Sequence, residues 1–184
     1  DNADSQLTIT GNSVLSDAEV SISLTTGIEI SESSTITTLT IGALTPIAIA
    51  ADKSFAGNIV VNYEGILRLT NKGALASAVV LNGGTIDIDE TLALSGTITQ
   101  SASSSIDLVE GKTLTYSGAS LYLGVNTLTI SGAGTLSNRN VVVLEEGSSV
   151  LKISGRNTIS GPVSFNAGMI DVDETSTLSS DLTL

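Results

Sequence analysis

The 184-residue sequence contains no cysteine and no histidine, and each absence removes a class of chemistry. Without cysteine the chain has neither disulfide bridges nor thiolate metal sites. Without histidine it lacks the commonest catalytic base and the commonest metal ligand. Serine–histidine and cysteine–histidine nucleophiles cannot form, and no phosphate-binding glycine loop is present. The sequence therefore predicts a protein that is not an enzyme.

Aromatic residues are almost as scarce. The chain has no tryptophan, two phenylalanines and three tyrosines, although 41% of its residues are hydrophobic. Leucine, isoleucine, valine and alanine must fill the core, and β-branched side chains favour extended backbone. Aliphatic side chains of similar size suit a core of stacked, nearly identical layers. The scarcity of aromatics also argues against a glycan-degrading enzyme, which would bind sugars on aromatic platforms.

Basic residues are few, with seven lysines and arginines against nineteen acids and a net charge of −12. Nucleic acids and anionic membrane surfaces both require clustered bases, so we expect neither as a partner. We see no signal peptide and no transmembrane run, and we expect no membrane insertion. Because the first residue is Asp1, we expect a segment that was processed or cut from a longer chain.

The sequence repeats itself over a long period. Residues 81–91 match residues 165–175 at seven of eleven positions, which indicates a repeat of about 84 residues. Residues 21–27 and 105–111 match at the same offset, as do residues 66–70 and 150–154. Repeats of this kind indicate stacked structural units. We predict one segment over 1–184 made of two tandem copies of about 84 residues, at about 1–90 and 91–174, with the start of a third at 175–184.

A finer pattern lies inside each copy. Pairs of hydrophobic residues at alternate positions are followed three residues later by glycine: Ile22/Leu24 before Gly27, Val79/Leu81 before Gly84, Ile106/Leu108 before Gly111, Val142/Leu144 before Gly147, and Val163/Phe165 before Gly168. Alternation with period two indicates strands with one buried face. The glycine marks a sharp corner that needs positive φ or a missing side chain. No run has helical spacing.

Two architectures are consistent with an uninterrupted series of short strands joined by corners. An antiparallel β-sandwich is the alternative, but its strands usually differ in length and its ends close with aromatic residues. The repeats favour an all-β, right-handed parallel β-helix, or β-solenoid, with about 20 residues per circuit, here called a rung. At ~21 residues per rung and ~4.8 Å between strands, two copies predict a rod about 40 Å long.

The segments Ile106-Asp-Leu-Val-Glu-Gly111 and Val142-Val-Leu-Glu-Glu-Gly147 repeat a hydrophobic pair before Glu-Gly. This pattern resembles the β-helical repeats of bacterial autotransporter passengers and filamentous adhesins. The resemblance implies a secreted, surface-displayed stalk or adhesin. We therefore expect an extracellular or cell-surface rod that joins other copies or adjoining repeats end to end, and that contacts cell-surface or matrix components. An ice- or carbohydrate-binding module is the alternative.

Acidic clusters recur in both copies and are the sharpest polar feature: Asp87, Asp89 and Glu90, then Asp171, Asp173 and Glu174. On a strand whose isoleucines point inward, the two aspartates of a cluster point outward, about 7 Å apart. Such a pair could form half of a calcium site, since Ca²⁺ needs several oxygen ligands. We favour a solvated outer face with no metal and no cofactor, because four rungs separate the clusters and the acids do not stack.

Other polar residues receive structural interpretations. Asn62 and Asn82 are separated by about one rung, and Asn166 repeats Asn82, so stacked asparagines can form a hydrogen-bonded ladder. The remaining candidates, read as isolated surface charges, are Arg68, Lys152 and Arg156.

Threonine pairs at alternate positions are frequent: Thr8/Thr10, Thr35/Thr37, Thr97/Thr99, Thr113/Thr115 and Thr127/Thr129. Regular arrays of this kind occur on ice-binding solenoids. Since Thr113 and Thr127 are separated by less than one rung, we expect the pairs not to align on one flat face. Strand propensity explains them. A flat, regular threonine face would instead favour ice or carbohydrate binding.

Overall fold

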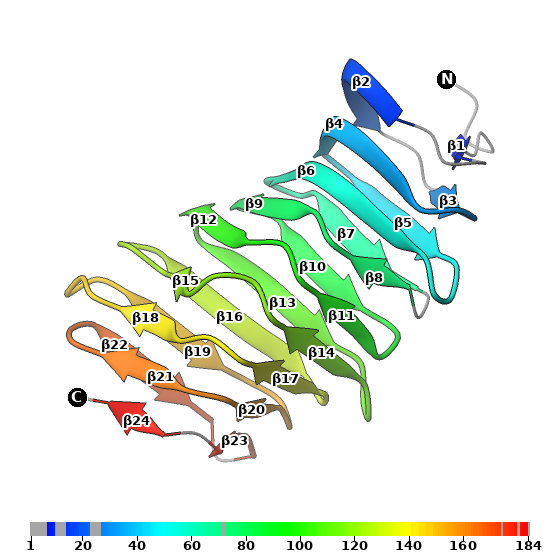
Figure 1. Ribbon diagram of the computed structural model, residues 1–184. Coiled ribbons are helices and arrows are strands. Elements are labelled where there is room, and N and C mark those ends of the chain that lie inside the picture. Colours follow the sequence, from blue (N-terminus) through cyan, green and yellow to red (C-terminus); the bar gives the residue numbers. More distant parts are fainter. Residues whose placement is uncertain are drawn as a thin grey trace.

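The computed structural model describes residues 7–9, 14–22, 27–70, 73–173, 175–179 and 181–183. This part of the chain contains no helix, and its parallel strands stack about 20 residues apart in about eight rungs of a β-solenoid (Figure 1). The predicted solenoid is therefore confirmed, and the antiparallel sandwich is wrong. The right-handed sense of the coil stays a prediction from the crossover rule.

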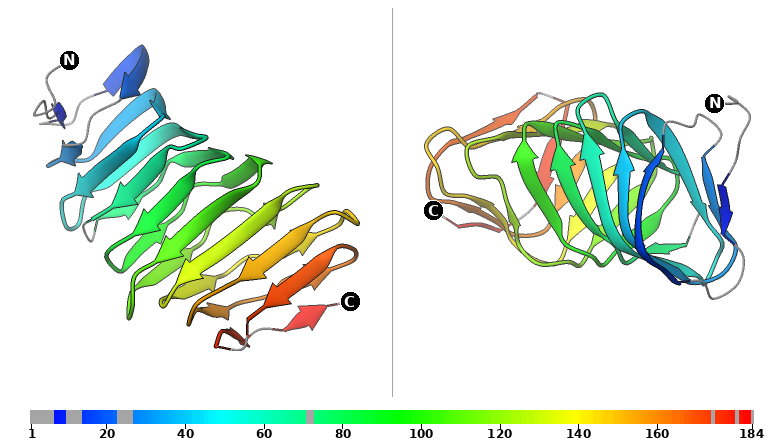
Figure 2. Two further views of the ribbon diagram at one scale, coloured as in Figure 1. Left: turned by 180° about the vertical axis from the view of Figure 1, so that it is seen from behind. Right: turned by 90° about the horizontal axis from the view of Figure 1, so that it is seen from above.

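One nine-stranded sheet, here called the first sheet, runs the length of the stack (Figure 2). Its neighbouring strands come from successive rungs, so the chain returns to this face once per rung. In spatial order it contains β1 (Leu7–Ile9), β3 (Ile28–Ile30), β5 (Leu44–Ile49), β7 (Ile66–Leu69), β10 (Thr85–Ile88), β13 (Ser104–Leu108), β16 (Thr127–Gly132), β19 (Val150–Ile153) and β22 (Met169–Val172).

The second sheet has eleven strands and branches at β6. It starts with β2 (Val14–Ile22), β4 (Ser34–Ile41) and β6 (Ser54–Asn62). One branch holds β8 (Ala74–Leu75), β11 (Leu92–Leu94), β14 (Thr113–Tyr116), β17 (Thr135–Asn138), β20 (Thr158–Ser160) and β23 (Thr177–Ser179). The other holds β9 (Ala78–Asn82) and β12 (Ile98–Ala102). A third sheet comprises β15 (Leu121–Tyr122), β18 (Val142–Leu144), β21 (Val163–Phe165) and β24 (Leu182–Thr183).

The branch lies beside a bulge in β4, where the register with β6 shifts between Ile36 and Thr38 and Thr37 is the extra residue. Gly57 of β6 pairs with Ile36 at this bulge and has a φ of 129°. A Cβ on Gly57 would lie 1.8 Å from the carbonyl oxygen of Ile36, so only glycine fits. The first part of β6 pairs with β8 and the last part with β9. Later rungs consequently use two short strands where the first rungs use one long bent strand.

Aliphatic side chains stack in columns inside the coil. In the first sheet one column is fully buried and runs through five rungs: Leu67, Ile86, Ile106, Ile130 and Ile153. Strand alternation places these residues inward and their sequence neighbours outward. Each layer therefore packs on a layer of the same kind, and aliphatic residues can fill the interior with few aromatics.

The predicted corner glycines are only partly confirmed. Gly111 and Gly168 have φ of 72° and 97°, a region that other residues rarely enter. Gly147 has no positive φ, and a Cβ there would meet open space. The recurrence of glycine therefore overstates how many corners depend on it.

Residues that are equivalent in the 84-residue repeat do not lie in the same stacked column; the two alignments are offset by two residues. The first-sheet strand that matches β10 in the sequence repeat is β22, four rungs away. The column that begins at Ile86 reaches Val172 rather than its sequence counterpart Ile170. Because the slip is an even number of residues, inward positions stay inward. Asp171 consequently stacks in the column of Thr85 and not in that of Asp87.

Replacing Leu128 with alanine tests the stacked core. Leu128 is fully buried in β16, and a buried Leu→Ala change should lower the free energy of unfolding by about 2–5 kcal/mol. The matched control is Thr129→Ala on the outward face of the same strand, expected to stay within about 0.5 kcal/mol of the parent. Urea unfolding measures both. Equal losses in the two variants would contradict the assignment of the faces.

Candidate functional site

The first acidic cluster surrounds an arginine. Arg68 of β7 lies beside Asp87 of β10 in the strand register. Its Nε is 2.6 Å from Oδ2 of Asp89 and 3.5 Å from Oδ2 of Asp87. The expectation that Arg68 is an isolated surface charge is therefore wrong. The sequence interpretation missed this pair because the partners lie on neighbouring rungs and are far apart along the chain.

Acids also stack on the next rung. Asp87 lies beside Asp107 of β13, and Oγ of Ser131 donates a hydrogen bond of 2.7 Å to Oδ1 of Asp107. Burial raises the pKa of Asp87, the charges of Asp89 and Asp107 raise it further, and Arg68 opposes them. The prediction that the acids do not stack is wrong here, because it compared only the two sequence-equivalent clusters. The row spans four rungs: its outer contacts, Arg68 with Asp87 and Ser131 with Asp107, are favourable, and its middle contact is between two acids.

The second cluster has different partners. Asp171 lies 3.8 Å from Nζ of Lys152 on the preceding rung. Asp173 accepts hydrogen bonds from the backbone N–H of Gly155 at 2.6 Å and of Thr175 at 3.1 Å. The bond from Gly155, with those from Thr175, lowers the pKa of Asp173. Glu174 lies outside the described residues. The two clusters are alike in sequence, but in the first both aspartates contact one arginine, whereas in the second Asp171 lies near Lys152 and Asp173 binds backbone N–H groups.

Ion pairs between rungs recur elsewhere on the surface. Nζ of Lys53 lies 2.6 Å from Glu32, and Nζ of Lys112 lies 2.8 Å from Glu90. Arg156, like Lys152, was expected to be isolated, but its Nη2 lies 3.2 Å from Oε1 of Glu110. Exposed pairs of this kind each contribute little to stability. Their shared feature is that they join different rungs, which gives the surface charges a structural role.

No group of three or more acids that could hold a metal ion is present among the described residues. In the first cluster the space between the two aspartate carboxylates is taken by the Arg68 guanidinium. Calcium binding at the described candidates, which are Asp87, Asp89, Glu90, Asp171 and Asp173, stays the alternative to the favoured interpretation of a solvated acidic face.

The asparagine ladder is confirmed for its first two members. Nδ2 of Asn82 donates to Oδ1 of Asn62 at 3.0 Å, and Oγ of Ser101 donates to Oδ1 of Asn82 at 3.1 Å. The ladder follows the last residues of β6 and β9. Asn166 follows β21, and its backbone N–H donates to the carbonyl of Leu144 at 2.9 Å.

Threonines and serines form two parallel columns on the outer side of β14, β17, β20 and β23. Thr113 and Thr115 begin these columns, and both are outward-facing and half-buried. We call the two columns the hydroxyl face, which consists of Thr113, Thr135, Thr158 and Thr177 beside Thr115, Ser137, Ser160 and Ser179. The prediction that these threonine pairs do not align with one another is confirmed for Thr113/Thr115 and Thr127/Thr129, because Thr127 lies in the first sheet. Thr113 and Thr115 stack instead on Thr135 and Ser137, which belong to no such pair.

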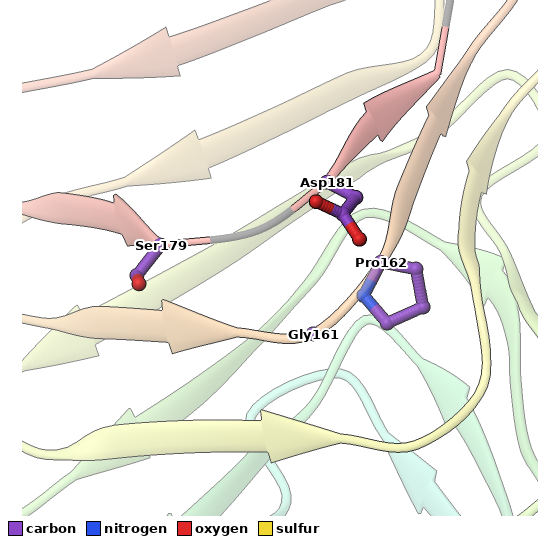
Figure 3. Close-up of a pocket in the computed structure, with 4 residues that line it drawn as sticks. All are labelled: Gly161, Pro162, Ser179 and Asp181. Carbon is purple, nitrogen blue, oxygen red and sulfur yellow. The ribbon is translucent and has the colours of Figure 1, made fainter.

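An open hollow of about 430 Å³ lies where the second and third sheets meet on the last rungs (Figure 3). Gly161, Pro162, Ser179 and Asp181 line it. A second hollow of about 220 Å³ is lined by Gly83, Ser103, Ser104, Ser105, Thr127 and Thr129. Neither lining includes an aromatic residue, whereas small-molecule sites are usually enclosed and largely apolar. We assign no catalytic group to either hollow.

Comparison with protein-family models, curated proteins and solved structures finds no match for this chain. In the described part of the chain, no helix has the length and apolar character needed to cross a membrane.

The raised pKa of Asp87 gives a pH-dependent prediction. The folded state binds the Asp87 proton more tightly than the unfolded chain, so the associated stability is present at low pH and is lost as pH rises through the raised pKa. Asp87→Asn should therefore stabilise the fold at pH 7, by less than about 1 kcal/mol. The gain should vanish below the ordinary carboxyl pKa of 3.8.

The matched control is Asp89→Asn, which removes the closest partner of Arg68 and should destabilise the fold at pH 7. Urea unfolding of both variants across pH measures the difference. If Asp87→Asn lowers the free energy of unfolding at pH 7 as much as Asp89→Asn does, the ionised Asp87 stabilises the fold and the prediction is wrong.

Proposed function

We propose that this chain is an extracellular structural or adhesive repeat segment, a stiff rod used for surface display or attachment. The supporting observation is the unbroken stack, in which one nine-stranded parallel sheet and one aliphatic core continue from rung to rung. Each rung is bonded to its neighbours, so stability adds along a single axis. A structure of this kind is suited to carry a terminus away from the point where the chain is anchored.

Backbone hydrogen bonds parallel to the axis account for the stiffness. The N–H of Thr85 donates to the carbonyl of Gly65 at 2.9 Å, and the N–H of Ser105 donates to that of Gly84 at 3.2 Å. Corners between strands are therefore bonded as well as the strands themselves. The inter-rung ion pairs and the asparagine ladder add side-chain contacts in the same direction.

Composition supports an extracellular setting. The outward faces carry hydroxyls and acids, and a net charge of −12 keeps an elongated particle soluble and discourages lateral association. The Glu-Gly corners resemble those of autotransporter passengers and filamentous adhesins, which are displayed on cell surfaces. Cell-surface or matrix components are the partners that such a rod would contact.

The last rung supports end-to-end association. Ile170 and Leu178 are only partly buried, and Val172 and Leu182 are 39% and 46% exposed, although all four continue buried columns. The strands β22, β23 and β24 each stand last in their sheets, with unpaired edges. We propose that another solenoid rung packs on this end, either from another copy of the chain or from adjoining repeats.

Spin-label distances test the stiffness. Leu44 and Asp171 lie in one outward column of the first sheet, six strand steps apart. With Leu44→Cys and Asp171→Cys, the backbone separation should be about 29 Å with a narrow distribution. The chain has no native cysteine to interfere. The control pair Ile66→Cys with Asp171→Cys should be about 5 Å shorter. A broad distribution for both pairs would contradict a stiff rod.

Sedimentation tests the end contact. The parent should associate as its concentration rises, and Val172→Lys with Leu182→Lys should abolish association, because two charges then enter the apolar end. The control replaces two more exposed apolar residues away from the last rung, Tyr122→Lys with Val125→Lys, and should associate like the parent. A parent that stays monomeric at all concentrations would argue against end-to-end association.

A further inference from the structure

The hydroxyl face is a regular surface that continues over four rungs of the described part of the molecule. Four consecutive rungs contribute outward pairs at alternate positions, and the residues between them, such as Leu114, Leu136 and Ile159, are buried in the core. Each outward pair is therefore held in place by a packed residue between its two members. The backbone also ties the columns to the rung before, because the N–H of Thr113 donates to Oγ1 of Thr91 at 3.1 Å.

The hydroxyls of this face have no protein partner among the described residues. Elsewhere in the described part, many serine and threonine hydroxyls are bonded; Thr85 and Ser105, stacked on the first sheet, lie 2.7 Å apart through their oxygens. On the hydroxyl face no such bond joins stacked side chains. These eight oxygens are therefore available to an external ligand, and their branched or short side chains have little rotamer freedom to lose.

The chemistry of the face restricts the ligand. No member of the two columns is charged, although the chain carries a net charge of −12. Lys112, which precedes β14, is paired with Glu90. The face has neither an aromatic platform for sugar stacking nor charges for an ionic ligand. A neutral surface of regularly stacked hydroxyls is suited to a ligand that is itself neutral and periodic.

The dimensions of the grid match ordered water. Neighbouring rungs are about 4.8 Å apart, and alternate residues along a strand are about 6.7 Å apart. In a tetrahedral water network with O···O contacts of about 2.75 Å, second neighbours lie about 4.5 Å apart, and the hexagonal layers repeat at about 7.3 Å. Each spacing of the face therefore differs from the corresponding spacing in the water network by less than about a tenth. We propose that the hydroxyl face binds the surface of ice crystals, a property that goes beyond the role as a rod.

The test measures thermal hysteresis and ice-crystal shape in solutions of the whole chain. The parent should depress the growth temperature of ice below the melting temperature and should facet the crystals. Thr135→Tyr, in the middle of the face, should lose most of this activity. The matched control is Thr129→Tyr, on the same rung but on the outer side of the first sheet, and should retain it. Circular dichroism and thermal unfolding check that both variants fold.

A second substitution on the face keeps the proposal testable if Thr135→Tyr does not fold. Ser137→Lys changes the neighbouring column and should also lose most of the thermal hysteresis. A parent without thermal hysteresis or crystal shaping overturns the proposal, as does an equal loss in Thr129→Tyr. Binding of the parent to crystalline cellulose or chitin with no effect on ice would assign the face to a polysaccharide and would also overturn it. None of these outcomes bears on the spin-label distances that test the rod.

Discussion

The parallel backbone ladder is the constraint from which the other features follow. Each strand pairs with the equivalent strand of the next rung, so a residue packs mainly against residues one rung away. Inward positions must then match in size, which leucine and isoleucine do in the column from Leu67 to Ile153. The interior consequently needs little aromatic volume. Tyr116 is an exception, and its hydroxyl donates to Ala119 and accepts from the N–H of Ile98.

The same ladder arranges the outer surface in rows. Like charges in adjacent positions of a row repel and opposite charges attract, which explains why Arg68 lies beside Asp87 and Lys152 beside Asp171. Asp107 breaks this alternation, and the hydroxyl of Ser131 compensates by donating to it. A strongly acidic chain can thus form a stacked structure because four of its cations, Lys53, Arg68, Lys112 and Lys152, each lie one rung from an acid. Neutral rows, such as the hydroxyl face, need no compensation.

Local patterns predicted the strands, their buried faces and the Asn62–Asn82 ladder, because period-two alternation and short offsets survive small changes in rung length. They did not predict which outward residues meet. The step between stacked residues varies, and it is longer from Thr113 to Thr135 than from Thr158 to Thr177. Which outward residues share a column can be worked out from the sequence only when the length of each corner is known. The hydroxyl face also includes serines, which a search for threonine pairs alone overlooks.

The proposed rod and the proposed ice-binding face do not compete, because they use different sides of the same strands. The core requires only the inward residue of each alternating pair, and outward positions accept any residue that tolerates extended backbone. Threonine does so well, since its β-branch favours strands. Recognition of a periodic solid, in turn, requires that many weak contacts be held at fixed spacing before binding, so that little entropy is lost on contact. The hydrogen-bonded stack supplies that fixed spacing, so the stiffness proposed for the rod would also serve the proposed ice-binding face.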